Sequence, residues 1–134
     1  MRLVQWSSVL VCLLAIGLHQ VSAEDKDVVR ENLNTAIPYG IKLLEAKEYL
    51  AFLKAFVEPE QLKKFSDRGD IEEFANKFGE GKSRQLLLVL KQIKDNKPTL
   101  SEDGKKAAYD IQVEGVTKKG ITFTKVGKYW YINN

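Results

Sequence analysis

The chain has 134 residues, of which 21 are basic and 18 acidic, giving a formal net charge of +3. This near balance is not the strongly basic composition of a nucleic-acid-binding protein, so we expect no nucleic-acid partner. The length suits one domain, which can bury an apolar core without disulfides.

Residues 1–23 have the pattern of a secretory signal peptide. Arg2 supplies the positive start, residues 9–18 form an uncharged apolar core, and Val21-Ser22-Ala23 places small residues at a cleavage site. An apolar core of ten residues is well short of the ~20 that a membrane-spanning helix needs. We therefore expect an exported protein, periplasmic or extracellular, that begins at Glu24 and has no stable membrane span.

Cleavage after Ala23 would remove the chain's single histidine, cysteine and methionine. The remaining residues 24–134 then contain no thiol or imidazole nucleophile, no histidine base and none of the usual nitrogen and sulfur ligands of zinc. Stability must come from an apolar core, since no disulfide can form. We expect a single domain over 24–134 with no catalytic residue, no metal site and no cofactor.

The first part of this domain has helical periodicity. Residues 24–34 are polar and charged, and we expect them to be a flexible leader. Thr35 is expected to cap a helix that reaches about Ala46, with Pro38 tolerated in its first turn. Proline and glycine positions divide the following stretch. Further helices are expected over residues 47–58, 59–69, 70–79 and 82–94.

After Pro98 the apolar period changes from helical to two. Residues 99–100 predict a short strand, 102–104 a hairpin turn, and 107–113 a second strand with one buried face. Two more strands are expected around Gly127, over residues 121–124 and 128–133. The fold class is therefore α+β, with N-terminal helices packed on a C-terminal four-stranded antiparallel meander. The expected core comprises Ile41, Leu44, Phe52 or Leu53, Phe74, Leu87, Leu90, Tyr109, Ile111, Phe123 and Trp130.

Three stretches carry a resemblance to a known family: Glu58-Pro59-Glu60, residues 98–104 and residues 121–132. With the order of elements, they resemble small exported bacterial proteins of unknown function, which are similar to the NTF2-like superfamily, also described as cystatin-like. The resemblance implies helices folded against a curved sheet to form a conical pocket, used for catalysis in some members and for binding or assembly in many. The chain departs from that pattern because only four strands are found and no enzymatic motif matches.

Three tyrosines are the candidate ligand-binding residues: Tyr39, Tyr49 and Tyr109. Tyr109 is the strongest, since strand alternation places its side chain on the inward face, whereas Asp110 points to the opposite face. The favoured hypothesis is a non-catalytic exported binding or interaction module, because no convergent polar constellation is visible. The alternative, implied by the resemblance, is a small pocket enzyme that transfers protons with a carboxylate and Tyr109.

A second candidate is an interaction surface on the open face of the sheet. Alternation places Trp130 in the core and Tyr129 and Tyr131 on the other face. Thr122 and Thr124 share that outward face from the neighbouring strand. Such a patch is a common place for pairing with another chain, so a homodimer through the sheet face is a further expectation.

Overall fold

The computed structural model describes residues 27–133, and the predicted signal peptide lies outside them. Within this part, helices precede a four-stranded antiparallel sheet, which confirms the predicted α+β class. No helix in the described residues is long and apolar enough to cross a membrane. The elements are α2 (Leu33–Glu45), α3 (Tyr49–Phe56), α4 (Pro59–Arg68), α5 (Ile71–Glu80), α6 (Ser83–Ile93), β1 (Thr99–Leu100), β2 (Lys106–Tyr109), β3 (Ile121–Val126) and β4 (Tyr129–Asn133).

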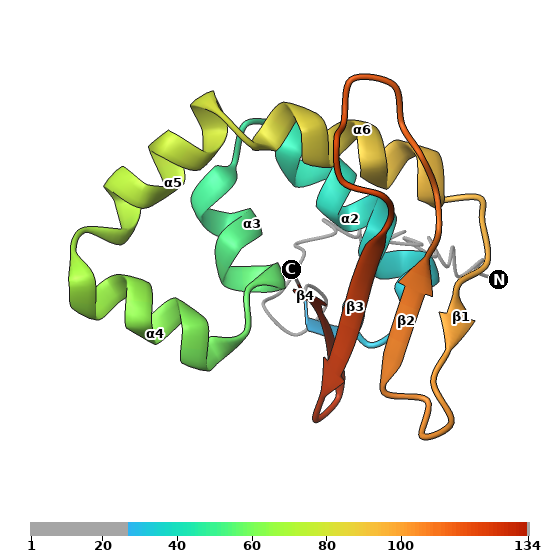
Figure 1. Cartoon of the computed structure of the whole chain (residues 1–134). Helices are drawn as coiled ribbons and strands as arrows, with labels where there is room; N and C mark the ends of the chain where they lie inside the picture. The colour runs from blue at the N-terminus through green and yellow to red at the C-terminus, as the bar shows by residue number, and fades with distance from the viewer. Residues whose placement is uncertain (1–26, 134) are drawn as a thin grey trace, which may run out of the picture.

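The sheet is a simple meander in the order β1-β2-β3-β4. Figure 1 shows α2 and α6 together behind the sheet, while α4 and α5 extend to one side. Facing residues of neighbouring strands hold the core: Ala107 pairs with Phe123, and Phe123 pairs with Ile132. The space between the helices and the sheet is filled by large apolar side chains that are each less than 2% exposed. These are Phe52, Phe56, Phe123, Leu90 and Ile93.

Helix α2 begins at Leu33, so the predicted cap at Thr35 is wrong. Asn32 is the N-cap, and its side-chain oxygen accepts a hydrogen bond from the Asn34 N–H at 2.9 Å. Asparagine is at least as good a cap as threonine, and here it comes first in the chain. Pro38 consequently lies inside the helix rather than in its first turn.

The segment before α2, expected to be a flexible leader, packs against the domain through Arg30, whereas Asp27 and Val28 are exposed. Arg30 is buried, and its guanidinium donates a hydrogen bond to the carbonyl of Ala55 in α3 at 2.7 Å. The carbonyl of Arg30 accepts a hydrogen bond from the Trp130 N–H in β4 at 3.1 Å. This contact lies along the outer edge of β4, where an unpaired strand would otherwise offer its backbone to another chain.

The predicted core needs one clear correction. Phe74 is 36% exposed, because it faces α4 and stacks on Phe65 with ring centroids 4.5 Å apart. Helix α4 contains no buried residue. The α4–α5 pair is therefore held to the rest of the molecule mainly through α5, which buries Ala75.

Strand β2 is shorter than the alternation predicted, ending at Tyr109. Its partner β3 starts at Ile121, directly opposite Tyr109, so no strand remains to pair with the residues that follow. Residues 110–120 form a loop, and Gly120 closes it by donating its N–H to the carbonyl of Ile111 at 2.8 Å. Gly120 has φ of +73°, and a Cβ there would overlap the carbonyl oxygen of Tyr109, so only glycine fits.

Candidate binding site

Tyr109 is a core residue in the structure. It is 4% exposed, and its ring meets the ring of Phe123 edge-on, with centroids 5.9 Å apart. Burial raises the pKa of its hydroxyl above the ordinary value of 10.0. Within residues 27–133 no hydrogen bond joins this hydroxyl to a carboxylate. Burial therefore favours the neutral form of this side chain.

Tyr39 and Tyr49 occupy the two ends of one chain of aromatic rings. The chain runs Tyr39–Phe56–Phe52–Phe78–Tyr49, with successive centroid distances of 6.3, 4.9, 5.8 and 6.1 Å. It ties α2, α3 and α5 together, and both tyrosines are half-buried at its ends. Burial also raises the pKa of Tyr39, while the nearby Arg30 charge lowers it. The structure thus separates Tyr39, Tyr49 and Tyr109 instead of collecting them in one pocket.

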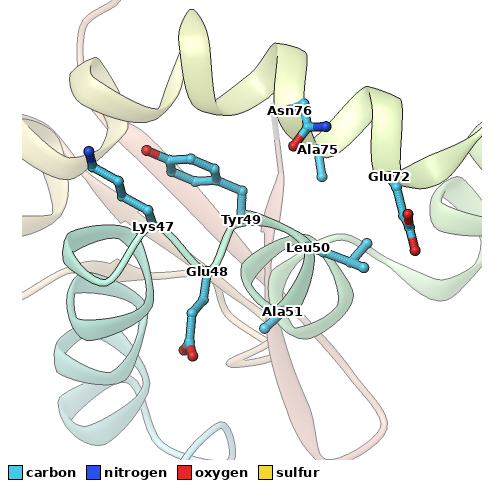
Figure 2. A pocket seen from close by; sticks show the side chains of 8 residues that line it. All are labelled: Lys47, Glu48, Tyr49, Leu50, Ala51, Glu72, Ala75 and Asn76. Atoms are coloured by element: carbon cyan, nitrogen blue, oxygen red, sulfur yellow. The ribbon is translucent and has the colours of Figure 1, made fainter.

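Tyr49 lies where two surface hollows meet. Hollows of about 460 and 720 Å³ both have Lys47 and Tyr49 in their walls. Figure 2 shows the first of them, with both side chains extending from the α2–α3 junction toward α5. We call the two together the Tyr49 hollow. Among the residues predicted from sequence as ligand-binding, Tyr49 lines both parts of this hollow.

Gly79 lets the Tyr49 ring lie against α5. A Cβ on Gly79 would overlap carbon atoms of that ring. The prediction that α5 ends at Gly79 is wrong by one residue, because the helix continues to Glu80 and Gly81 is its C-cap. The carbonyl of Gly79 also accepts a hydrogen bond from the Ser83 hydroxyl at 2.6 Å, which joins α5 to α6. The glycine therefore serves close packing rather than helix termination.

Lys47 has a left-handed backbone, with φ of 59°. It follows α2 in a Schellman arrangement: the Lys47 N–H bonds the Leu44 carbonyl at 3.1 Å, and the Glu48 N–H bonds the Leu43 carbonyl at 2.9 Å. Glycine normally occupies this position, because a side chain makes it roughly 1–2 kcal/mol less favourable. Unfavourable backbone conformations gather at functional sites, and this one lies in the wall of the Tyr49 hollow.

The Tyr49 hollow is acidic. Its charged lining consists of four glutamates, one lysine and one arginine, a formal excess of two negative charges. One of the glutamates, Glu45, forms an exposed ion pair with Lys91 at 3.5 Å. The acidic character contrasts with the positive net charge of the whole chain. The charged residues are Glu45, Lys47, Glu48, Glu72, Glu80 and Arg84.

The predicted surface on the sheet is only partly open. Thr122, Thr124 and Tyr129 are half-buried, and Tyr131 is 6% exposed. The Arg30 guanidinium lies 4.5 Å from the ring centroid of Tyr129 and 5.7 Å from that of Tyr131. In the described residues the buried Thr124 hydroxyl has no hydrogen-bond partner. A segment before α2 therefore covers much of the tyrosine pair that the sequence placed on an outward face.

No group of three or more histidine, cysteine, aspartate or glutamate side chains is arranged to hold a metal ion in residues 27–133. No protein-family model matches the chain, and neither a curated protein nor a solved structure is significantly similar to it.

Proposed function

We propose that this protein is an exported, non-catalytic interaction module that binds a polypeptide partner at the Tyr49 hollow. The observation that carries the proposal is the position of Tyr49, half-buried between two adjoining hollows and braced by Phe78 and Gly79. Tyrosine is enriched among the residues that dominate binding energy at protein interfaces, because it combines a large apolar ring with a polar tip.

The acidic lining favours a partner with a basic surface. Glu48 and Glu72 belong to the lining of one hollow, and Glu80 to the lining of the other. Charges around an interface mainly accelerate encounter and exclude wrong partners, while the central aromatic contact supplies affinity. The partner is expected to bring positive side chains to this rim and an apolar group to the Tyr49 ring.

The packed interior supports a function without chemistry of its own. Phe52, Phe56 and Phe123 fill the region between helices and sheet, where an enzyme of the alternative kind would need a hollow. Tyr109 is neutral and in contact with Phe123 instead of a carboxylate. The proton-transfer alternative therefore finds no supporting arrangement around Tyr109, and the NTF2-like resemblance stays a prediction.

The experiment compares two matched tyrosines. The protein is captured with its partner from the native exported fraction, and the affinity of the purified pair is measured by calorimetry for the native protein, Tyr49→Ala and Tyr39→Ala. Both tyrosines are half-buried ends of the same ring chain, but Tyr39 lines neither part of the Tyr49 hollow. We expect Tyr49→Ala to weaken binding at least roughly tenfold, as central interface aromatics do, and Tyr39→Ala to leave it within about twofold.

Equal losses of binding affinity in Tyr49→Ala and Tyr39→Ala would mean that the substitutions disturb the aromatic packing in general and not a binding site at Tyr49. That result would contradict the proposal. So would a captured partner whose affinity is unchanged by Tyr49→Ala. A small molecule in place of a polypeptide, or a second copy of this chain bound through the sheet face, would equally overturn the proposed partner class.

A further inference from the structure

A separate cavity of about 270 Å³ lies between α5, α6 and the β2–β3 loop of residues 110–120. It shares only Gln85 with the Tyr49 hollow. The loop is long for a connection between neighbouring antiparallel strands, where two to five residues are usual. Val116 of this long loop forms one wall of the cavity, so the extra loop residues help to enclose it. We call this space the loop cavity.

The floor of the loop cavity is apolar. Phe78 comes from α5, Leu86 and Val89 from α6, and Ile121 from the start of β3. Val89 and Ile121 are buried, and Phe78 and Leu86 are half-buried, so the floor belongs to the core and is held in place by it. A ligand that covers this floor removes apolar surface from water, and therefore needs an apolar part.

The rim of the loop cavity is basic. Lys82 stands directly before α6, and Lys118 belongs to the β2–β3 loop. Gln85 adds an uncharged amide, and neither aspartate nor glutamate is present in the lining formed by the described residues. The first turn of α6 contains no acidic residue, so the positive end of its dipole adds to the field of the lysines. A ligand at this rim is favoured if its polar end is negative.

We propose that the loop cavity binds a small amphipathic anion, with an apolar chain on the Phe78–Val89 floor and a carboxylate at Lys82. The volume indicates how large a part of the ligand the site can take up. At about 30 Å³ for each water in the liquid, the cavity corresponds to roughly nine water-sized groups. An unbranched monocarboxylate of about eight carbons matches that space. This inference is independent of the polypeptide partner proposed for the Tyr49 hollow.

The test titrates the purified protein with octanoate, 1-octanol and octylammonium and follows methyl signals by NMR. These probes share one chain length and differ in the charge of the head group. We expect octanoate to shift the methyl signals of Val89, Val116 and Ile121 and to bind more tightly than octanol, with octylammonium weakest. Methyl signals of Ala51 and Ala75, which line the Tyr49 hollow, are expected to stay in place.

Two variants assign the head group and the chain. Lys82→Gln is expected to weaken octanoate roughly tenfold, the usual range for a lost charged hydrogen bond, while octanol binding is unchanged. Lys63→Gln, an exposed lysine on α4 that lines none of the hollows described here, is the charge control and should change neither. Val116→Trp, in the loop, should block octanoate and octanol alike.

Equal affinities of octanoate and octanol, or tightest binding of octylammonium, would overturn the anionic specificity. Octanoate binding that survives Val116→Trp would place the ligand elsewhere and overturn the site. The absence of methyl shifts at Val89, Val116 and Ile121 at millimolar octanoate would overturn the proposal altogether. None of these results depends on the Tyr49 variants, so each proposal can fail alone.

Discussion

The Tyr49 hollow and the loop cavity have opposite chemistry although consecutive residues of α5 line them. Gly79 lies in the wall of the acidic Tyr49 hollow, whereas Phe78 lies in the floor of the apolar, basic-rimmed loop cavity. The Phe78 ring also meets the Tyr49 ring edge-on at 6.1 Å. The end of one helix therefore lines or supports both proposed recognition surfaces, and substitutions there can act on one or on both.

The largest effect is expected from Phe78→Ala, which removes a ring that lines the loop cavity and also packs against Tyr49. Phe78 stacks on Phe52 at 5.8 Å as well as on Tyr49. Phenylalanine truncations in cores cost about 3–5 kcal/mol, and for this half-buried ring we expect about 2–4 kcal/mol of unfolding free energy, measured by urea denaturation. Octanoate and partner binding should both weaken. Phe65→Ala is the control, since within residues 27–133 Phe65 stacks on the partly exposed Phe74 and on no other ring.

If Phe78→Ala lowers the free energy of unfolding by less than about 1 kcal/mol and leaves octanoate and partner binding intact, Phe78 does not support the two surfaces and the account is contradicted.

Gly79→Ala should disturb the Tyr49 hollow alone. The added methyl group would overlap the Tyr49 ring, and overpacking of this kind costs about 1–3 kcal/mol, against about 1 kcal/mol gained from better helix propensity. We expect a net loss of stability and weaker partner binding, with octanoate binding unchanged.

In a Tyr49→Ala background, Gly79→Ala is expected to raise the free energy of unfolding instead of lowering it. Without the ring there is nothing for the methyl group to meet, so alanine should stabilise α5 by up to about 1 kcal/mol. A double-mutant cycle by urea denaturation measures the difference. Additive effects would mean that Tyr49 does not lie over Gly79.

Lys47→Gly is expected to stabilise the protein by about 1 kcal/mol, because glycine adopts the left-handed conformation freely. If the Lys47 side chain contributes to recognition, partner binding weakens while thermal stability rises. Lys42→Gly, inside α2, is the matched control and should destabilise by about 1 kcal/mol. Destabilisation by both substitutions would contradict the left-handed assignment.

Tyr109 lies outside both surfaces, and ionisation of its hydroxyl should affect stability only at high pH. Its pKa is raised in the folded protein by burial, whereas in the unfolded chain it ionises near the ordinary value of 10.0. Stability from this group is therefore fully present below pH 10 and falls as the pH rises above it. Unfolding curves between pH 7 and 11 should show a steeper alkaline loss for the native protein than for Tyr109→Phe, with both binding activities unchanged at pH 7.

If stability falls with pH equally steeply in Tyr109→Phe and in the native protein, the Tyr109 hydroxyl is solvated and its pKa is not raised by burial.

Much of the fold followed from local patterns in the sequence. Pro59 and Gly69 mark the two ends of α4, and Asp70 caps α5 as predicted, accepting from the Glu72 N–H at 2.9 Å. Trp130 is buried on the face that alternation assigned to it. These features depend on the backbone preferences of single residues or on a repeat of two, which the sequence displays directly.

The site could be predicted only in part, because its decisive features are tertiary. Tyr49 was identified from its residue type, but nothing in a lysine indicates the left-handed backbone of Lys47. From sequence, Gly79 is typical of a helix end, but in the structure it makes room for the Tyr49 ring. Ile111 keeps the alternation of a strand, yet it belongs to a loop because β3 starts only at Ile121, opposite Tyr109. Each of these depends on a neighbour that is distant in the chain.

Dimerisation through the sheet face stays a prediction. Arg30 covers part of the surface that it would need, as the cation–π distances to Tyr129 and Tyr131 indicate. Any contact between copies would have to use the more open part of that face, which includes Lys106 and Ala108.

Hydrogen exchange with and without the captured partner tests the central claim most directly. Amide protection reports which backbone segments a partner covers or orders. We predict slower exchange over residues 47–51, 72–76 and 79–85, which surround Tyr49, and no change over 121–133 in the sheet. Protection confined to 121–133, with exchange around Tyr49 unchanged, would contradict the account.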